Sequence, residues 1–212
     1  HHQILIDCGN TTFCRLRELG LAKQVQHILI THCHDDHVGS LATLLLYLKH
    51  VARQQIVPTI WVPSTDFQLH IFQYLQFAMP KPEKYARFQL LHEQNDLIIE
   101  GIDTFGLHVP GMQSYGYCFE DEEEVVLYSG DIGPSDILFD HLETKSEKPI
   151  RVFHDVTFEA ADGIHAYYLD LLPYLKTYQI FGYHHDHRQV PDDNPIALVA
   201  EHPELLLVPQ PS

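Results

Sequence analysis

The feature that most constrains this chain is a run of histidine and aspartate residues that directly follows a short apolar segment. Residues 28–30 are Ile-Leu-Ile, which is typical of a buried strand, and Gly39 allows the chain to bend after the polar run. Imidazole and carboxylate groups at this spacing are typical ligands of divalent metal ions. The run therefore predicts a metal site on a loop at the end of a strand. Its candidate ligands are His32, His34, Asp36 and His37.

The spacing of these four residues favours two ions rather than one. We expect His32 and His34 to serve the first ion, and Asp36 and His37 to serve the second. One loop cannot fill the coordination shells of two ions, so other strand ends must supply further ligands.

The best further candidates in the sequence are His108, Asp131 and His184. A carboxylate such as Asp131 can bridge two divalent ions and hold them about 3.5–4 Å apart. The last ligand stays open at this level, because His185 or His187 has the same chemistry as His184.

Apolar periodicity predicts an α/β fold in which helices pack on sheets. Strands are expected at residues 4–6, 27–31, 60–62, 97–99, 104–108, 115–119, 125–128, 151–154 and 179–183. Helices are expected at residues 12–19, from residue 40 through 48, near residues 67–75 and at residues 165–175. We expect one domain over residues 1–212, since 45% of the residues are hydrophobic and only 20% are charged.

The charge balance restricts the partners. The formal net charge is −16, and no run of Lys or Arg provides a basic face, so we expect no long nucleic acid as ligand. A small anionic substrate fits, because bound divalent ions would dominate the local field. Apolar runs are shorter than the roughly 18 residues that cross a bilayer, so no membrane contact is expected. Four scattered cysteines are typical of reduced thiols, which predicts a cytoplasmic location.

The whole ligand pattern resembles the metallo-β-lactamase fold superfamily of dinuclear hydrolases. The resemblance rests on the loop of residues 32–37, on His108, on Ser129-Gly130-Asp131 and on a late histidine. It implies an αββα sandwich with two divalent ions at one edge of the sheets. That superfamily usually has a strand pair ahead of the segment that is Ile-Asp-Cys-Gly here, and this sequence begins almost directly with it. Zinc is expected, with manganese or iron as alternatives, because nitrogen and carboxylate ligands accept all three. In this fold Asp7 is a candidate acceptor for a hydrogen bond from a ligand histidine.

Local motifs favour one branch of that superfamily. Many lactamase-like members place the third histidine directly after Pro-Gly, where this chain has Met112, and a thioether does not replace imidazole. His108 with the following Ser-Tyr-Gly-Tyr of residues 114–117 instead resembles the ribonuclease Z and cyclic-phosphate phosphodiesterase branch. His108 and Asp131 are too close in sequence to enclose the RNA-binding arm of ribonuclease Z. A small phosphodiester is therefore expected.

A second match concerns the acid group. The segment Asp155-Val156-Thr157-Phe158 resembles a Glu-Ala-Thr-Phe segment of ribonuclease Z. This resemblance implies that Asp155 orients His165, which donates a proton to the leaving oxygen. Asp36 is a candidate acceptor for a proton from the attacking water.

These observations predict a phosphodiesterase that acts on small cyclic nucleotides or cyclic phosphates through a hydroxide held between two ions. One alternative keeps the ions but hydrolyses carbonyl esters, as a thioesterase, glyoxalase or lactonase does. A second alternative is a binding or scaffold protein without activity. Resemblance to this branch also implies a homodimer.

Overall fold

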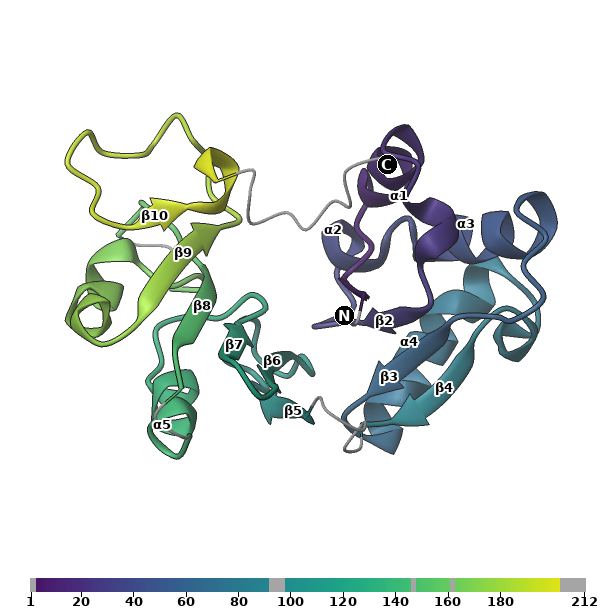
Figure 1. Cartoon of the computed structure of the whole chain (residues 1–212), viewed down its shortest axis with the longest axis horizontal. Coiled ribbons are helices and arrows are strands. Elements are labelled where there is room, and N and C mark those ends of the chain that lie inside the picture. The colour runs from purple at the N-terminus through teal and green to yellow at the C-terminus, as the bar shows by residue number, and fades with distance from the viewer. Residues whose placement is uncertain (1–2, 92–97, 146–147, 161–162, 203–212) are drawn as a thin grey trace. The chain divides into compact units, whose positions relative to one another are not determined.

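The computed structural model describes residues 3–91, 98–145, 148–160 and 163–202. The chain divides into two compact units, residues 1–92 and residues 93–212. Figure 1 shows that each unit has a sheet and helices of its own. The expectation of one domain over the whole chain stays a prediction. Within the described residues, the helices are too short or too polar to cross a membrane.

The first unit contains a four-stranded parallel sheet with the order β1-β2-β3-β4. Its strands are β1 (Ile4–Ile6), β2 (His27–Leu29), β3 (Thr59–Val62) and β4 (Arg87–Leu90). Its helices are α1 (Thr12–Glu18), α2 (Asp35–Val38), α3 (Leu41–Leu46) and α4 (Thr65–Ala78), with short 3₁₀ turns at Ala22–Gln24 and Pro82–Lys84 and a π turn at Tyr47–Val51. Because all four strands run parallel, the loops that follow them leave the same edge of the sheet.

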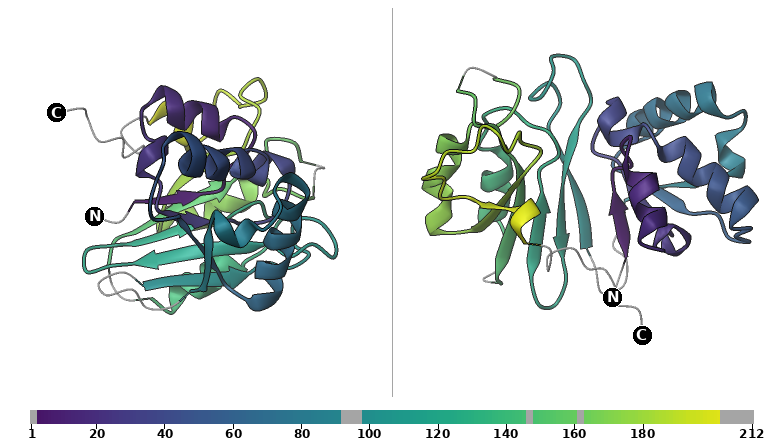
Figure 2. Two further views of the ribbon diagram at one scale, coloured as in Figure 1. Left: turned by 90° about the vertical axis from the view of Figure 1, so that its right-hand side faces the viewer. Right: turned by 90° about the horizontal axis from the view of Figure 1, so that it is seen from above.

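The bounds and buried faces of these helices follow from local sequence features. Ser64 begins α4, since its side chain accepts a hydrogen bond from the backbone N–H of Phe67 at 3.2 Å. The leucines of α3 at positions 41, 44 and 45 are fully buried, as their helical spacing predicts. Gly20 has a φ of 72° just after α1, a conformation that glycine adopts without strain. The helices lie on one face of the sheet (Figure 2).

The second unit contains a six-stranded mixed sheet with the order β10-β9-β8-β7-β6-β5. Its strands are β5 (Ile98–Asp103), β6 (Tyr115–Glu120), β7 (Val125–Tyr128), β8 (Ile150–Asp155), β9 (Gln179–Tyr183) and β10 (Ala197–Leu198). Its helices are α5 (Ile137–Glu143) and the 3₁₀ helices η4 (Tyr168–Lys176) and η5 (Val199–Glu201). Strands β7 to β10 run parallel, whereas β5 and β6 are antiparallel to their neighbours.

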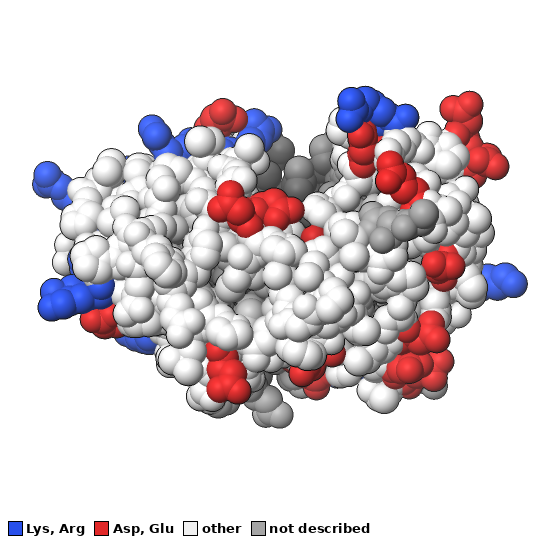
Figure 3. Space-filling view, turned by 180° about the vertical axis from the view of Figure 1, so that it is seen from behind, with Lys and Arg blue, Asp and Glu red and all other residues white. Residues whose placement is uncertain are grey.

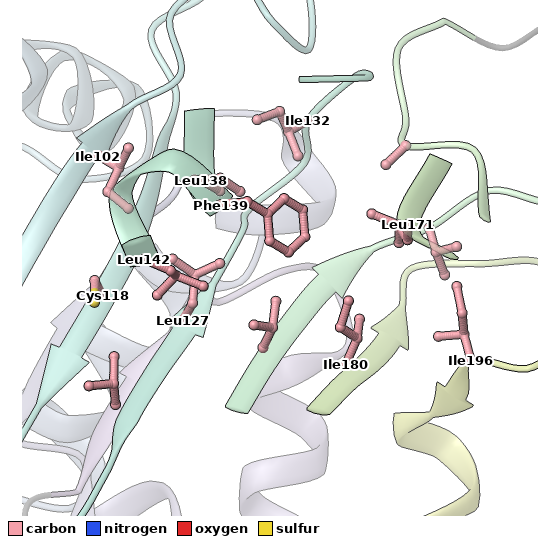
Figure 4. Packing of buried hydrophobic residues seen from close by; sticks show 14 residues of the cluster. Ile102, Cys118, Leu127, Ile132, Leu138, Phe139, Leu142, Leu171, Ile180 and Ile196 are labelled. Atoms are coloured by element: carbon pink, nitrogen blue, oxygen red, sulfur yellow. The ribbon is translucent and has the colours of Figure 1, made fainter. Parts of the chain in front are cut away.

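One hydrophobic cluster holds the second unit together. Leu138, Phe139 and Leu142 of α5 point from the helix toward the sheet (Figure 4). Leu127 of β7 and Ile180 of β9 meet them from the sheet side, and both are buried. This packing fixes α5 on the face of the sheet, so the strand ends beside it have a rigid support.

Two expected elements differ from the structure. Residues 104–108 form a turn rather than a strand, because the Asp103 side chain accepts a hydrogen bond from the backbone N–H of Phe105 and Gly106 has a φ of 73°. The helix expected at residues 165–175 is the 3₁₀ helix η4, which contains Pro173. Proline has no backbone N–H to donate, so it disfavours a regular α-helix there. Residue 97 of the expected strand at 97–99 lies outside the described residues.

Candidate metal centre

The candidate ligands of the first unit follow β2 directly. His32 and His34 lie on the loop after this strand, and Asp36 and His37 lie in the short helix α2. The side chain of His32 is fully buried and that of His37 is nearly so, and each ring has a polar partner, Thr31 for His32 and Asp7 for His37. The bend expected at this loop is therefore present, and α2 ends at Gly39.

Asp7, which follows β1, fixes this loop from the neighbouring strand. Its carboxylate accepts a hydrogen bond from the Thr31 backbone N–H at 2.7 Å and from the Thr31 hydroxyl at 2.8 Å. It also lies 2.7 Å from Nδ1 of His37, so the expected contact with a loop histidine is present. Burial raises the pKa of Asp7, although the hydrogen bonds with His37 and Thr31 act in the opposite direction. A carboxylate on Nδ1 directs the other ring nitrogen of His37 toward a ligand position.

The contacts among the four loop residues are compatible with the two expected pairs, and the assignment of each pair to one ion stays a prediction. Nε2 of His32 lies 3.0 Å from Nδ1 of His34, so both nitrogens can reach one ion. Nε2 of His37 lies 3.7 Å from a carboxylate oxygen of Asp36. The first pair offers two imidazole nitrogens, and the second offers a nitrogen and a carboxylate oxygen; zinc, manganese and iron accept both kinds of atom.

Gly9 was not predicted as part of this site, although it sets the position of α2. A Cβ atom at Gly9 would lie 1.6 Å from the backbone oxygen of Asp36. The backbone N–H of the preceding residue, Cys8, donates to the His37 carbonyl at 2.6 Å. The Ile-Asp-Cys-Gly segment therefore supports the metal loop through its backbone as well as through Asp7.

Three candidate site residues of the second unit lie at or near the carboxyl ends of parallel strands, whereas His108 lies in the turn after β5 rather than at the expected strand end. Asp131 follows β7, Asp155 ends β8, and His184 follows β9. Gly130 and His184 have φ values of 64° and 63°, and the latter is uncommon for a residue with a side chain. Such backbone strain concentrates at functional sites, because surrounding contacts must hold it.

These residues and His108 form one cluster within the second unit. Nε2 of His108 lies 3.9 Å from Asp131, and Nδ1 of His184 lies 3.5 Å from the same carboxylate oxygen. The ligand atoms of His108, Asp131 and His165 all lie within 4.8 Å of one another. Nδ1 of His108 donates to the Ile164 carbonyl at 3.0 Å, which leaves Nε2 as the nitrogen for a metal ion.

Asp155 contacts two histidines rather than one. Its Oδ2 lies 2.7 Å from Nδ1 of His165, the contact expected for the acid pair. Its Oδ1 lies 3.2 Å from Nδ1 of His184, a contact that the sequence did not reveal. The backbone N–H of Ile132 also donates to Oδ2 at 3.1 Å. Burial alone would raise the pKa of Asp155, but hydrogen bonds with His165 and His184 outweigh it and lower the pKa.

A hydroxyl network under the cluster was also missed. The Tyr183 hydroxyl donates to the Gly130 carbonyl at 2.9 Å and lies 3.1 Å from the Ser129 hydroxyl. Ser129 in turn accepts a hydrogen bond from the backbone N–H of Asp155 at 2.8 Å. Tyr183 directly precedes His184, so one side chain connects the backbone beside His184 with the backbone beside Asp131. The position of Tyr183 at the end of an expected strand, directly before His184, was the one sequence feature that could have indicated this role.

The late histidines have different surroundings. His184 belongs to the cluster, whereas the ring of His185 lies 5.8 Å from the ring of Phe158 and 6.2 Å from that of His187. In the part of the chain that the structure describes, neither His185 nor His187 is in a group of possible ligands. His184 is therefore the better candidate for the last ligand.

The donor set fits divalent metal ions. Each unit gathers imidazole nitrogens and carboxylate oxygens, and His32, His37, His108 and Asp131 are buried. Buried imidazole and carboxylate groups are usually paired or bound to a metal. The residues that would hold ions are His32, His34, Asp36 and His37 in the first unit, and His108, Asp131 and His184 in the second.

Comparison with solved structures identifies the fold. The protein YhfI from Bacillus subtilis, described as a metallo-β-lactamase fold protein, matches with a TM-score of 0.66 and 18% identity over 87% of this chain and 74% of that chain. Human tRNase Z, short form, matches with a TM-score of 0.64 and 18% identity over 90% of this chain and 86% of that chain. The expected metallo-β-lactamase fold is confirmed.

Comparison with sequences identifies the family. The anti-Pycsar protein Apyc1 of Bacillus phage 010DV004 is 30% identical over 198 residues, which cover 82% of this chain and 73% of the relative. The family model described as "Anti-Pycsar protein Apyc1" matches residues 1–199. The chain therefore belongs to the anti-Pycsar Apyc1 family, within the metallo-β-lactamase fold.

Proposed function

We propose that this protein is a metal-dependent phosphodiesterase that hydrolyses small cyclic nucleotides or related cyclic phosphates. The observation that carries the proposal is the pair of Asp155 and His165, 2.7 Å apart, within the cluster that also contains His108 and Asp131. An imidazole held by a buried carboxylate suits protonation of an alkoxide leaving group, which a phosphodiester has. Membership of the Apyc1 family supports the proposal, and we extend to this chain the anti-Pycsar role that its relatives' name states.

The proposed reaction uses the ligands and the acid group that the sequence predicts. Two divalent ions, zinc by preference, would be held by the seven ligands predicted from the sequence, and when bound they provide a nucleophile at neutral pH and neutralise charge on the phosphate. Asp36 accepts a proton from the attacking water. His165 donates a proton to the leaving oxygen, and Asp155 holds the imidazole in the orientation that this transfer needs.

The charge distribution supports a small substrate rather than a long nucleic acid. The formal net charge is −16. Figure 3 shows Lys and Arg side chains in small separate groups near the margins of that view, with Asp and Glu side chains between them. A protein that holds many phosphates needs a continuous basic surface.

A substrate panel tests the reaction class. With zinc or manganese supplied, 3′,5′-cyclic mononucleotides and bis(p-nitrophenyl) phosphate are expected to be hydrolysed, and an acyl thioester and a lactone are not. Turnover of the thioester or the lactone without turnover of any phosphodiester would replace this proposal with the carbonyl-ester hydrolase. Absence of turnover with stoichiometric metal bound would favour a binding protein.

A matched pair of histidine variants tests the ligands. His34→Ala is expected to weaken zinc binding at least tenfold, whereas His70→Ala changes a histidine on the exposed side of α4 and leaves binding unchanged. Metal content after dialysis and zinc titration against a fluorescent chelator measure the difference. Equal affinities of the two variants would contradict the assignment of His34.

A further inference from the structure

A cavity of about 460 Å³ lies within the second unit, apart from the residues of the candidate metal centre. Four of its lining residues are buried: Phe139 of α5, His154 of β8, Ala166 and Leu171. Successive residues of a strand point to opposite faces of a sheet, so His154 and the neighbouring Asp155 face different sides. The volume lies within the roughly 300–1,000 Å³ range of small-molecule sites.

His154 gives this cavity a buried polar group. Its side chain is 2% exposed, and its Nδ1 donates to the Asp155 carbonyl at 2.6 Å, because a carbonyl can only accept. In the neutral ring the other nitrogen, Nε2, is then an acceptor. Among the described residues Nε2 has no hydrogen-bond partner. A buried acceptor of this kind costs free energy until a donor reaches it.

Flat aromatic rings form one wall. The rings of Phe139 and Tyr174 are stacked with centroids 3.6 Å apart and an angle of 5° between their planes. The ring of His154 is also parallel to Phe139, at an angle of 3°. Figure 4 shows Phe139 projecting from α5 toward the side where Leu171 lies. Stacked rings favour a planar aromatic occupant.

The charges at the opening select against anions. Asp136 and Asp170 are exposed lining residues, and the described lining contains no Lys or Arg. Asp136 also accepts a hydrogen bond from the Tyr174 hydroxyl at 2.6 Å. We propose that this cavity binds a planar aromatic molecule that carries an N–H donor and no negative charge. This site is separate from the proposed phosphodiesterase site and requires no bound metal.

Indole and 1-methylindole are the matched probes, since they differ only in the N–H donor and neither is a strong metal ligand. In an NMR titration of the full chain, we expect indole to bind with a Kd of roughly 0.1–1 mM and to shift the methyl signals of Ala166 and Leu171. 1-Methylindole is expected to bind about fivefold to tenfold more weakly, because it cannot donate to Nε2 of His154. Indole-3-acetate is expected to bind more weakly than indole, because its carboxylate meets Asp136 and Asp170.

Two variants locate the binding. Ala166→Leu adds side-chain volume inside the cavity and is expected to abolish the indole shifts. His154→Phe keeps an aromatic ring but removes the acceptor nitrogen, so it is expected to remove the preference for indole over 1-methylindole. Absence of saturable indole binding up to 5 mM, or equal binding of the two indoles to the unchanged protein, would overturn the proposal. Those two measurements use the unchanged chain, so they decide the matter even where a variant fails to fold. Zinc binding is measured in parallel. Absence of zinc binding would contradict only the proposed function and not the indole site.

Discussion

Replacing Gly9 with alanine is expected to damage the metal loop, whereas the same change at Gly20 is not. A Cβ atom at Gly9 would lie 1.6 Å from the backbone oxygen of Asp36 and 2.6 Å from its backbone carbon. At Gly20, which has a φ of 72°, a Cβ atom would meet nothing within 4 Å. Both variants add one methyl group to the same unit, so Gly20→Ala controls for the loss of glycine itself.

The contact distances set the expected loss of folding stability. A contact of at least 3.0 Å requires Asp36 and residue 9 to separate by 3.0 − 1.6 = 1.4 Å. This separation forces α2 away from the segment that contains Gly9. It therefore breaks the hydrogen bond between the Cys8 N–H and the His37 carbonyl. Overpacking costs about 1–3 kcal/mol, and a lost hydrogen bond adds roughly 1 kcal/mol. We expect a loss of about 2–4 kcal/mol for Gly9→Ala and about 1 kcal/mol of backbone strain for Gly20→Ala.

Urea unfolding of the metal-free protein measures this difference. Trp61 is the single tryptophan of the chain and is buried in β3, so its fluorescence reports on the first unit. Zinc titration of the same samples is expected to show at least tenfold weaker binding for Gly9→Ala and unchanged binding for Gly20→Ala. Equal unfolding midpoints and equal zinc affinities of the two variants would refute the role of Gly9.

Three further predictions concern single groups. Tyr183→Phe removes the hydroxyl that donates to Gly130 and is expected to weaken zinc binding about tenfold in a chelator competition; unchanged affinity would contradict a positioning role. Burial raises the pKa of the Cys8 thiol to about 11, so iodoacetamide at pH 7.5 is expected to label the exposed Cys14 first, and equal labelling by peptide mass spectrometry would be inconsistent with this. The pKa of Asp155 is lowered in the folded state, so its stabilisation is present above the unfolded-state pKa and is lost as the pH falls through the folded-state value. Asp155→Asn should therefore flatten the acid-side decline in the unfolding midpoint of the metal-free protein, and an unchanged slope would count against this linkage.

The sequence predicted the elements whose signals are local. The strand before the metal loop depends on residues close to one another in the chain. The position of the candidate ligands on one loop was also predictable, because the spacing of residues 32–37 reflects the geometry of one turn after a strand.

Contacts between distant residues were harder to predict. Asp155 was expected to contact His165, but its second contact, with His184, depends on the parallel register of β8 and β9. The role of Gly9 depends on the close approach of its backbone to that of Asp36, which neither composition nor periodicity predicts. Periodicity predicted a strand at residues 104–108, yet the Asx turn at Asp103 ends β5 first. In the first two cases a tertiary contact decides what the local pattern leaves open, whereas at Asp103 a local side-chain hydrogen bond does.

The two oxygens of Asp155 connect metal binding with proton donation. Oδ1 lies 3.2 Å from His184 and Oδ2 lies 2.7 Å from His165, so an asparagine at this position retains only one side-chain oxygen for two imidazole N–H donors. Asp155→Asn is therefore expected to weaken zinc binding about tenfold or more and also to slow hydrolysis of a cyclic nucleotide about 100-fold. His165→Ala is expected to leave zinc affinity within about threefold and to affect only the proton donation.

The leaving group separates these effects. A cyclic nucleotide releases an alkoxide that needs a proton, whereas bis(p-nitrophenyl) phosphate releases a stable phenolate that does not. His165→Ala should therefore slow hydrolysis of the cyclic nucleotide about 100-fold and that of the nitrophenyl ester only a few-fold. Equal slowing of both substrates would refute proton donation by His165. Loss of bound zinc in this variant would instead make His165 a metal ligand, since its ring nitrogen also lies within 4.8 Å of the ligand atoms of His108 and Asp131.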